Sequence, residues 1–171
     1  MMILSTYIKP IHSSIAYGLW IMSILLHILL MIFVTKKFIL RFDIKNIFPS
    51  YFVVYVGIVV GSVTAPVFNS PNIGQILFWF GFISYLLLLP IVLYRVFKTK
   101  AIPEPALPTI AIFAAPASLC LAGYMSSFQE KNMLIVWFLT SLSIAMLLGV
   151  LVYMPKMLKL LLSLLVQQWI I

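Results

Sequence analysis

The sequence predicts an all-α integral membrane protein with five transmembrane helices, and three observations support this class. The chain is 64% hydrophobic and only 8% charged, with a mean hydropathy of +1.20, whereas soluble domains are about half apolar and a quarter charged. Its apolar stretches reach the ~20 residues that a helix needs to cross the hydrocarbon layer. Its three carboxylates, Asp43, Glu104 and Glu130, all lie outside these stretches. We therefore expect the chain to lie in a lipid bilayer.

Turn-forming residues divide the apolar chain into its predicted helices. Pro49 precedes the second helix, where a missing backbone N–H costs nothing, and Asn69 to Asn72 form a turn cluster before the third. Pro108 marks the start of the fourth helix. The spans are expected at about 14–35, 51–68, 73–94, 109–128 and 133–154. They make up one transmembrane domain over residues 1–159, followed by a divergent hydrophobic tail over 160–171.

Positive charge predicts the orientation of these spans. Nine basic residues follow the first, third and fifth spans, and only Lys9 and Lys131 lie on the other side. The nine are Lys36, Lys37, Arg41, Lys45, Arg95, Lys98, Lys100, Lys156 and Lys159. Because basic loops stay in the cytoplasm, we expect a multi-pass protein of the cell membrane. The net charge of +8 thus reflects topology rather than nucleic-acid binding.

This orientation also suggests that spans are missing upstream. The first span would run from outside to inside and leave residues 1–13 external, although no signal peptide precedes them. Such a topology is expected when an odd number of spans has been lost from the start of a chain. The sequence therefore predicts a fragment.

The predicted spans fall into two kinds that alternate along the chain. In residues 109–124, nine of sixteen residues are Ala, Gly, Ser, Thr or Cys, and the second span is also rich in small residues. The other three spans are dominated by Leu, Ile, Met, Phe and Trp. Small residues let helix backbones approach closely, whereas bulky ones suit contact with lipid. We therefore expect helical hairpins, each with an inner and an outer helix.

The two inner helices supply the candidate functional residues. Each contains an Ala-Pro pair, at Pro66 and at Pro116, and a proline inside a helix removes a hydrogen bond and bends the axis. The candidates for lining a pore are Gly57, Gly61, Ser62, Thr64, Pro66, Ala115, Pro116, Ser118 and Gly123. Close packing of helices explains the same residues equally well, so both interpretations stay open.

The absence of charge inside the spans excludes several chemistries. No span contains a carboxylate, Lys or Arg, and carboxylates within the membrane are typical of proton relays and ion coupling. We therefore expect no enzyme, no catalytic residues, no metal site and no cofactor. His27 has no second ligand at its depth, so a hydrogen bond between helices is expected for it. Cys120 lies within a span and predicts no disulfide.

The aromatic residues predict contacts with the bilayer. Trp20, Trp79 and Trp137, with Tyr51 and Tyr94, are expected to act in part as anchors at the membrane interface. The stretch containing Phe78, Phe80 and Phe82 is expected to face lipid.

Two segments carry a resemblance to a known family. FPSYFVVYVGIVVGSVTAP (Phe48–Pro66) and LPTIAIFAAPASLCLAGY (Leu107–Tyr124) resemble the tellurite-resistance/dicarboxylate transporter (TDT) family, which includes slow-type anion channels and malate permeases. The segments Thr6–Ile32 and Phe78–Lys98 are similar to it as well. The resemblance implies ten spans in five hairpins around a central pore, of which the five here look like the fourth through eighth.

The resemblance also implies a function and an assembly. It predicts transport of small anions, such as a C4-dicarboxylate, tellurite or a similar oxyanion, along the Pro-bent inner helices, and a homo-oligomer that is a trimer in that family. The ninth helix of the family supplies a pore-blocking phenylalanine, and the tail LLLSLLVQQWII does not resemble it. The alternative is a truncated structural module that transports nothing alone or needs an oligomer.

Overall fold

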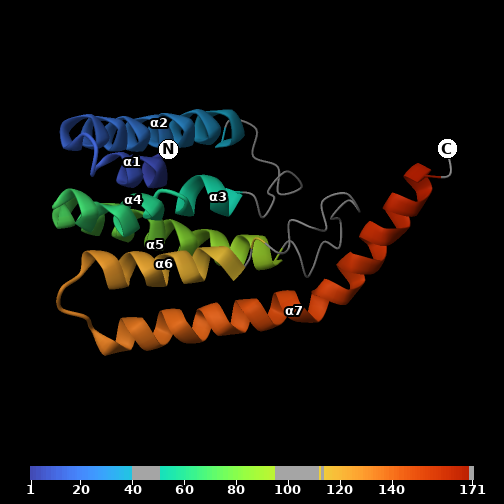
Figure 1. Ribbon diagram of the computed structural model, residues 1–171. Coiled ribbons are helices and arrows are strands. Elements are labelled where there is room, and N and C mark those ends of the chain that lie inside the picture. Colours follow the sequence, from blue (N-terminus) through green and yellow to red (C-terminus); the bar gives the residue numbers. More distant parts are fainter. Residues whose placement is uncertain (40–50, 95–111, 113, 170–171) are drawn as a thin grey trace.

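The computed structural model describes residues 1–39, 51–94, 112 and 114–169, and each regular element in these ranges is helical (Figure 1). The elements are α1 (Met2–Ile8), α2 (Ser13–Ile39), α3 (Tyr51–Val56), α4 (Val59–Thr64), the 3-10 helix η2 (Ala65–Phe68), α5 (Pro71–Tyr94), α6 (Ala114–Ser127) and α7 (Met133–Trp169). The predicted all-α class is therefore confirmed.

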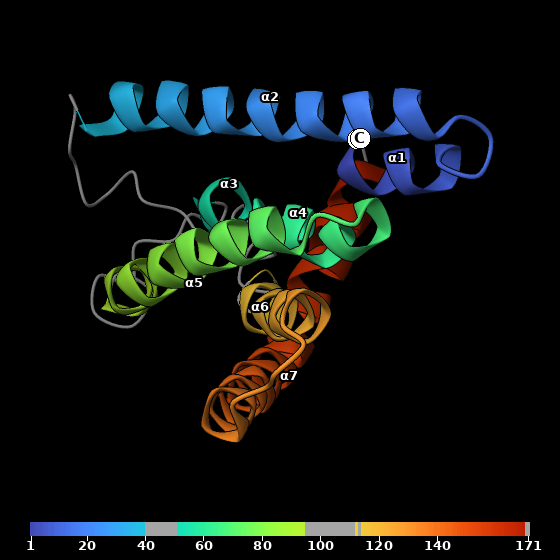
Figure 2. The same ribbon diagram turned by 90° about the vertical axis from the view of Figure 1, so that its left-hand side faces the viewer.

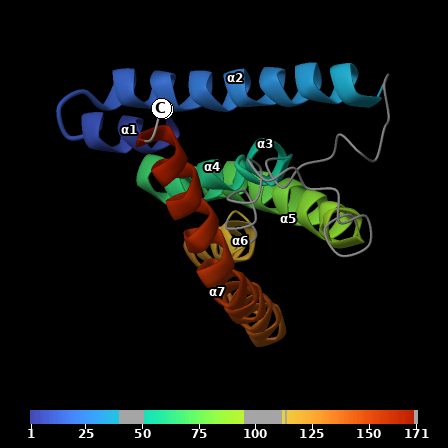
Figure 3. The same ribbon diagram turned by 90° about the vertical axis from the view of Figure 1, so that its right-hand side faces the viewer.

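The helices form an antiparallel bundle in which α2, the α3–α4–η2 segment, α5, α6 and α7 alternate in direction (Figure 1). Seen from either end, α2 lies on one side and α7 on the other, with α4, α5 and α6 between them (Figures 2 and 3). The turns that hold Lys9 and Lys131 lie at one end, and the end of α2 with Lys36 and Lys37 lies at the other. The basic residues that the structure describes are thus separated as the sequence predicts.

Among the described residues, three helices are long and apolar enough to cross a membrane: Ser13–Lys37, Pro71–Tyr94 and Met133–Val152. They correspond to the first, third and fifth predicted spans. The fourth is described only from Ala114, because residues 109–111 and 113 lie outside the described ranges. Beyond the fifth span, α7 continues as a helix to Trp169, with Pro155 inside it and a bend in its second half (Figure 1).

The second predicted span is interrupted, which the sequence analysis did not foresee. A turn at Gly57 and Ile58 separates α3 from α4, and the tighter η2 begins at Ala65. A Cβ atom on Gly57 would lie 2.2 Å from the carbonyl oxygen of Val53, so only glycine accommodates this close approach of the backbone. The expected single helix with one bend at Pro66 is therefore wrong, because the chain also breaks at Gly57.

His27 compensates for this break. Its Nε2 atom lies 3.0 Å from the carbonyl oxygen of Val54, and since a carbonyl can only accept, Nε2 donates. A backbone carbonyl without a partner at membrane depth costs several kcal/mol. The predicted interhelical hydrogen bond of His27 is confirmed, and its partner is the backbone beside the break.

Two apolar clusters meet along the interrupted span. Val56 and Val59 belong to a cluster with residues of α5, α6 and α7, whereas Ile58 and Ala65 belong to a cluster with residues of α1 and α2. Each residue of α4 is buried or half-buried. Helix α4, the middle part of the second predicted span, is therefore enclosed by other helices of this chain.

Two expectations about aromatic residues are corrected. Trp20 is fully buried, stacks on Phe68 and donates its indole N–H to Thr64 Oγ1 at 2.8 Å, so it is not an interfacial anchor. Phe78 is also fully buried and packs against Tyr124 and other rings, although Phe80 is 48% exposed. The expectation of a lipid-facing stretch is therefore wrong for Phe78, because successive positions on a helix point in different directions.

Replacing His27 by phenylalanine should lower stability in detergent by about 1 kcal/mol, because the Val54 carbonyl loses its donor while an aromatic ring stays in place. Thermal unfolding followed by circular dichroism measures the change. His12 is exposed, so the His12→Phe variant is the matched control. Equal unfolding temperatures for the two variants would contradict the assigned role.

Candidate functional site at the contact of α4 and α6

The contact between α4 and α6 is held by two serines that bond reciprocally. Ser127 Oγ donates to the carbonyl oxygen of Ser62 at 2.7 Å, and the two hydroxyl oxygens lie 2.8 Å apart. Ser62 Oγ also lies 3.2 Å from the carbonyl oxygen of Gly123. Because Ser127 gives its proton to the carbonyl, the single hydroxyl proton of Ser62 is shared between Ser127 Oγ and the Gly123 carbonyl oxygen. We call Ser62, Gly123 and Ser127 the serine clamp.

The serine clamp satisfies the carbonyl that Pro66 leaves without a helical partner. In a helix the Ser62 carbonyl would accept from the backbone N–H of residue 66, and proline has none. Ser127 supplies the missing donor from the neighbouring helix. The proline is therefore tolerated inside the bundle because a hydroxyl of α6 stands directly opposite it.

Glycines allow the close approach that the clamp requires. A Cβ atom on Gly123 would lie 2.5 Å from Val59 Cγ1, and one on Gly81 would lie 2.2 Å from Val59 Cγ2. Val59 thus fills the space between α5 and α6 that these two glycines leave. Gly74 is equally confined, since its Cβ would lie 2.4 Å from Ser127 Oγ. The small residues here bring three helices into contact, as small-residue motifs do in membranes.

The end of η2 is fixed by the N-terminal segment. Lys9 donates from Nζ to the carbonyl oxygen of Val67 and lies 5.8 Å from the centroid of the Phe68 ring. Thr64, which accepts from Trp20, also contacts the carbonyl oxygens of Val60 and Gly61. These contacts give polar partners to the last turn of the α3–α4–η2 segment.

The predicted pore-lining residues divide into a buried and an exposed set. Gly61, Ser62, Thr64, Pro116 and Gly123 are buried between helices of this chain, and Gly57 is half-buried. Pro66, Ala115 and Ser118 are exposed. The contacts of the buried set are those of close packing, and pore lining by its members stays a prediction.

The expected bend at Pro116 is not tested by the described residues. Helix α6 is described from Ala114, and residues 109–111 and 113, which precede Pro116, lie outside the described ranges. The bend at Pro116 therefore stays a prediction, whereas the carbonyl freed by Pro66 has a donor in the structure.

One face of α6 is exposed and made almost entirely of small residues. Ala115, Ser118, Ala122, Met125 and Ser126 are exposed, and they recur at the spacing of one helical face. Ala122 and Ser126 are not among the residues predicted from the sequence, although their spacing from Ser118 could have indicated them. We call these five residues the α6 face.

The α6 face differs from the other exposed surfaces of the bundle. On α2, α5 and α7 the exposed side chains are mostly Leu, Ile, Phe, Met and Trp. Ser118 Oγ lies 3.0 Å from the carbonyl oxygen of Ala115 and 3.2 Å from that of Ala114, within its own helix. This hydroxyl can therefore turn toward a ligand without breaking an interhelical contact.

The site is polar but not charged. The buried polar residues among those described are Ser5, Ser23, Ser62, Thr64 and Ser127, all of them hydroxyls. No group of three His, Cys, Asp or Glu side chains that could hold a metal ion occurs in the described part of the chain. Such a site can stabilise a ligand through hydroxyls and backbone dipoles, and it offers no fixed charge for acid–base chemistry.

The apolar helical bundle, with three candidate spans in the part of the chain that the structure describes, is that of a membrane protein, and its hydroxyl-bearing, uncharged described interior suits a channel or transporter. The chain matches the voltage-dependent anion channel (SLAC1) family over residues 1–169 and belongs to that family. This confirms the relation to slow-type anion channels indicated by the sequence. The comparisons with curated proteins and with solved structures gave no match. Channels and transporters of this family conduct anions rather than catalyse reactions.

Replacing Ser127 by alanine should destabilise the bundle by about 1–3 kcal/mol, because the buried Ser62 carbonyl loses its donor. In a Pro66→Ala background the same change should cost less, since residue 66 then supplies an N–H. Unfolding in detergent of the two single variants and the double variant measures this coupling. Ser126 is an exposed neighbour, so Ser126→Ala is the control. Strictly additive effects of the two changes would show that the clamp does not compensate for the proline.

Replacing Gly123 by alanine should cost about 1–3 kcal/mol through overpacking against Val59. The Val59→Ala change should restore part of this loss in the double variant, because it opens space for the added methyl group. A Cβ atom on Gly149 would meet no other atom within 4 Å, so Gly149→Ala is the control. A Gly123→Ala variant as stable as this control would rule out the tight contact.

Proposed function

We propose that the chain forms part of an anion-conducting pathway in the cell membrane and that the α6 face lines it. The end with Lys36 and Lys37 is placed in the cytoplasm, and the chain crosses the membrane in multiple passes. The substrate class is a small anion, either a C4-dicarboxylate or an oxyanion such as tellurite. Membership of the anion channel family supports the class of function.

The exposure of small residues on α6 is the observation that carries this assignment. A helix that faces only lipid gains nothing from Ala115, Ser118 and Ala122 in place of leucine, whereas a pathway needs the room that small side chains leave. Ser118 adds a hydroxyl that can donate to an anion. Hydroxyls, helix dipoles and pore width then give weak selectivity without ion pairs.

The buried small residues have a supporting role in this proposal. The serine clamp and Val59 hold α4 and α5 against the buried face of α6. This packing fixes the direction in which the α6 face points. The pathway is completed by other helices or by further copies of the chain, and we propose a homo-oligomer.

Replacing Ser118 by leucine should reduce anion flux about tenfold or more, because the larger side chain narrows the pathway and removes its hydroxyl. Flux of malate and of chloride into proteoliposomes, driven by a concentration gradient, measures the effect. Ser141 is a matched control, since it is exposed on α7 and its hydroxyl also bonds within its own helix, to Phe138 O at 2.9 Å.

The possible results separate the competing interpretations. Equal flux through the Ser118→Leu and Ser141→Leu variants would remove the α6 face from the pathway. No flux through the unmodified chain, together with a folded and stable protein, would favour the structural module that transports nothing alone. Loss of flux in the Ser118→Leu variant only would support the proposal.

A further inference from the structure

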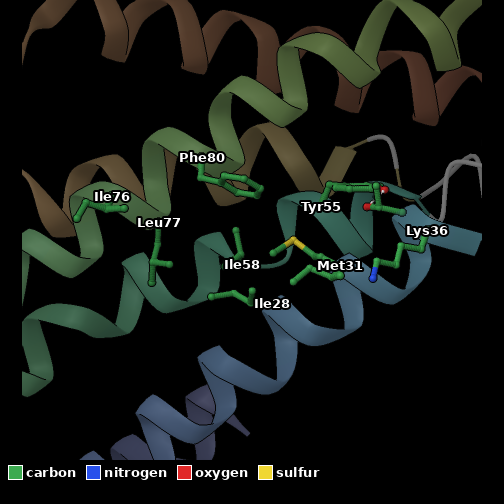
Figure 4. Close-up of a pocket in the computed structure, with 10 residues that line it drawn as sticks. Ile28, Met31, Lys36, Tyr55, Ile58, Ile76, Leu77 and Phe80 are labelled. Atoms are coloured by element: carbon green, nitrogen blue, oxygen red, sulfur yellow. Dashed lines mark hydrogen bonds between the residues drawn. The ribbon is translucent and has the colours of Figure 1, made fainter. Parts of the chain in front are cut away.

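A groove of about 530 Å³ lies between α2, α3 and α5, away from the α6 face (Figure 4). Its volume lies in the range of small-molecule sites. The walls are almost wholly apolar, and ten residues line it: Ile28, Met31, Ile32, Thr35, Lys36, Tyr55, Ile58, Ile76, Leu77 and Phe80. Both α2 and α5 pack against α3, which contributes Tyr55 to the lining.

The polar groups of this groove gather at one of its ends. Thr35 Oγ1 and the Tyr55 hydroxyl lie 2.7 Å apart, and the Lys36 side chain lies at the same end of the groove (Figure 4). Ile28, Leu77 and Ile76 lie toward the other end. The groove therefore has one cationic, hydroxyl-bearing end and one purely apolar end.

The two ends of the groove match two levels of a membrane, the headgroup region and the hydrocarbon layer. The apolar span of α2 ends at Lys37, so Lys36 lies where the hydrocarbon layer gives way to headgroups. From Lys36 to Ile28 the groove extends about 12 Å along α2, at 1.5 Å per residue, into the hydrocarbon layer. Ile76, at 69% exposure, and Phe80, at 48%, form an open outer edge. The acidic side chain among the described residues, Glu130, lies at the opposite end of the bundle, in the turn before α7.

We propose that the groove binds an anionic phospholipid, with its phosphate on Lys36 and the adjacent hydroxyls and one acyl chain along the apolar walls. A basic pocket between transmembrane helices at the cytoplasmic surface suits an acidic headgroup. We favour a lipid over a second copy of the chain as the occupant, because the ammonium group of Lys36 lies at the level of the lipid headgroups. The site is separate from the anion pathway and does not depend on it.

Native mass spectrometry of the full chain in a neutral detergent tests the proposal, with phosphatidylglycerol and phosphatidylcholine as probes. The unmodified chain should retain phosphatidylglycerol in preference. Lys36→Gln should weaken this binding about fivefold, the effect of one basic group near a headgroup. Lys37 has the same charge but does not line the groove, so Lys37→Gln should leave binding unchanged. Equal losses in the two variants would show diffuse surface charge and overturn the proposal.

A second pair of variants tests the apolar part without touching charge. Ile76→Trp fills the open edge of the groove and should reduce binding, whereas Leu87→Trp, at a position on α5 that is 65% exposed and outside the groove, should not. Ile76 is exposed, so the larger ring does not disturb the core. If Ile76→Trp instead dissociates an oligomer, the occupant is another copy of the chain and the proposal fails. Displacement of the lipid by equimolar inorganic phosphate would also overturn it.

Discussion

The constraint on which this structure depends is that a backbone carbonyl inside a membrane must have a donor. The α3–α4–η2 segment departs from regular helix twice, at Gly57 and at Pro66. Each departure is matched by a side chain from another helix, His27 at the Val54 carbonyl and Ser127 at the Ser62 carbonyl. These two donors tie the irregular segment to α2 on one side and to α6 on the other, so its irregularity fixes the arrangement of its neighbours.

Small residues have two different uses in this bundle, and exposure separates them. Gly123 and Gly81 are confined by Val59, so their lack of a side chain serves contact between helices. Ala115 and Ser118 are exposed, and close contact among the described residues does not explain their size. The amino-acid composition of a segment does not distinguish small residues that serve helix contact from small residues that are exposed. For this reason, close packing and pore lining explained the same segments equally well at the level of the sequence.

The sequence predicted the fold where local patterns decide it. Long apolar runs located α2, α5 and α7, and the isolation of His27 within a span led to its interhelical bond. The break at Gly57 was not predictable, because it depends on a histidine of another helix reaching the Val54 carbonyl. Trp20 was misplaced for a similar reason, since its partner, Thr64, is distant in sequence. For the candidate site, the sequence predicted which types of residue occur there. The direction in which each side chain points depends on how the helices pack, so it became visible only in the structure.

The charge at the end of the α3–α4–η2 segment also bears on the proposed function. The C-terminal end of a helix carries partial negative charge, which would repel an anion that approaches a pathway beside it. At the end of η2, Lys9 donates to the Val67 carbonyl and places a full positive charge against that partial charge. The interior of the described bundle contains hydroxyls and no ionised group, so in the proposed pathway charge would act on an anion from the ends only. A lysine at the end of the bundle would attract anions to that pathway, and an uncharged interior would let them leave again, which is the balance that conduction requires.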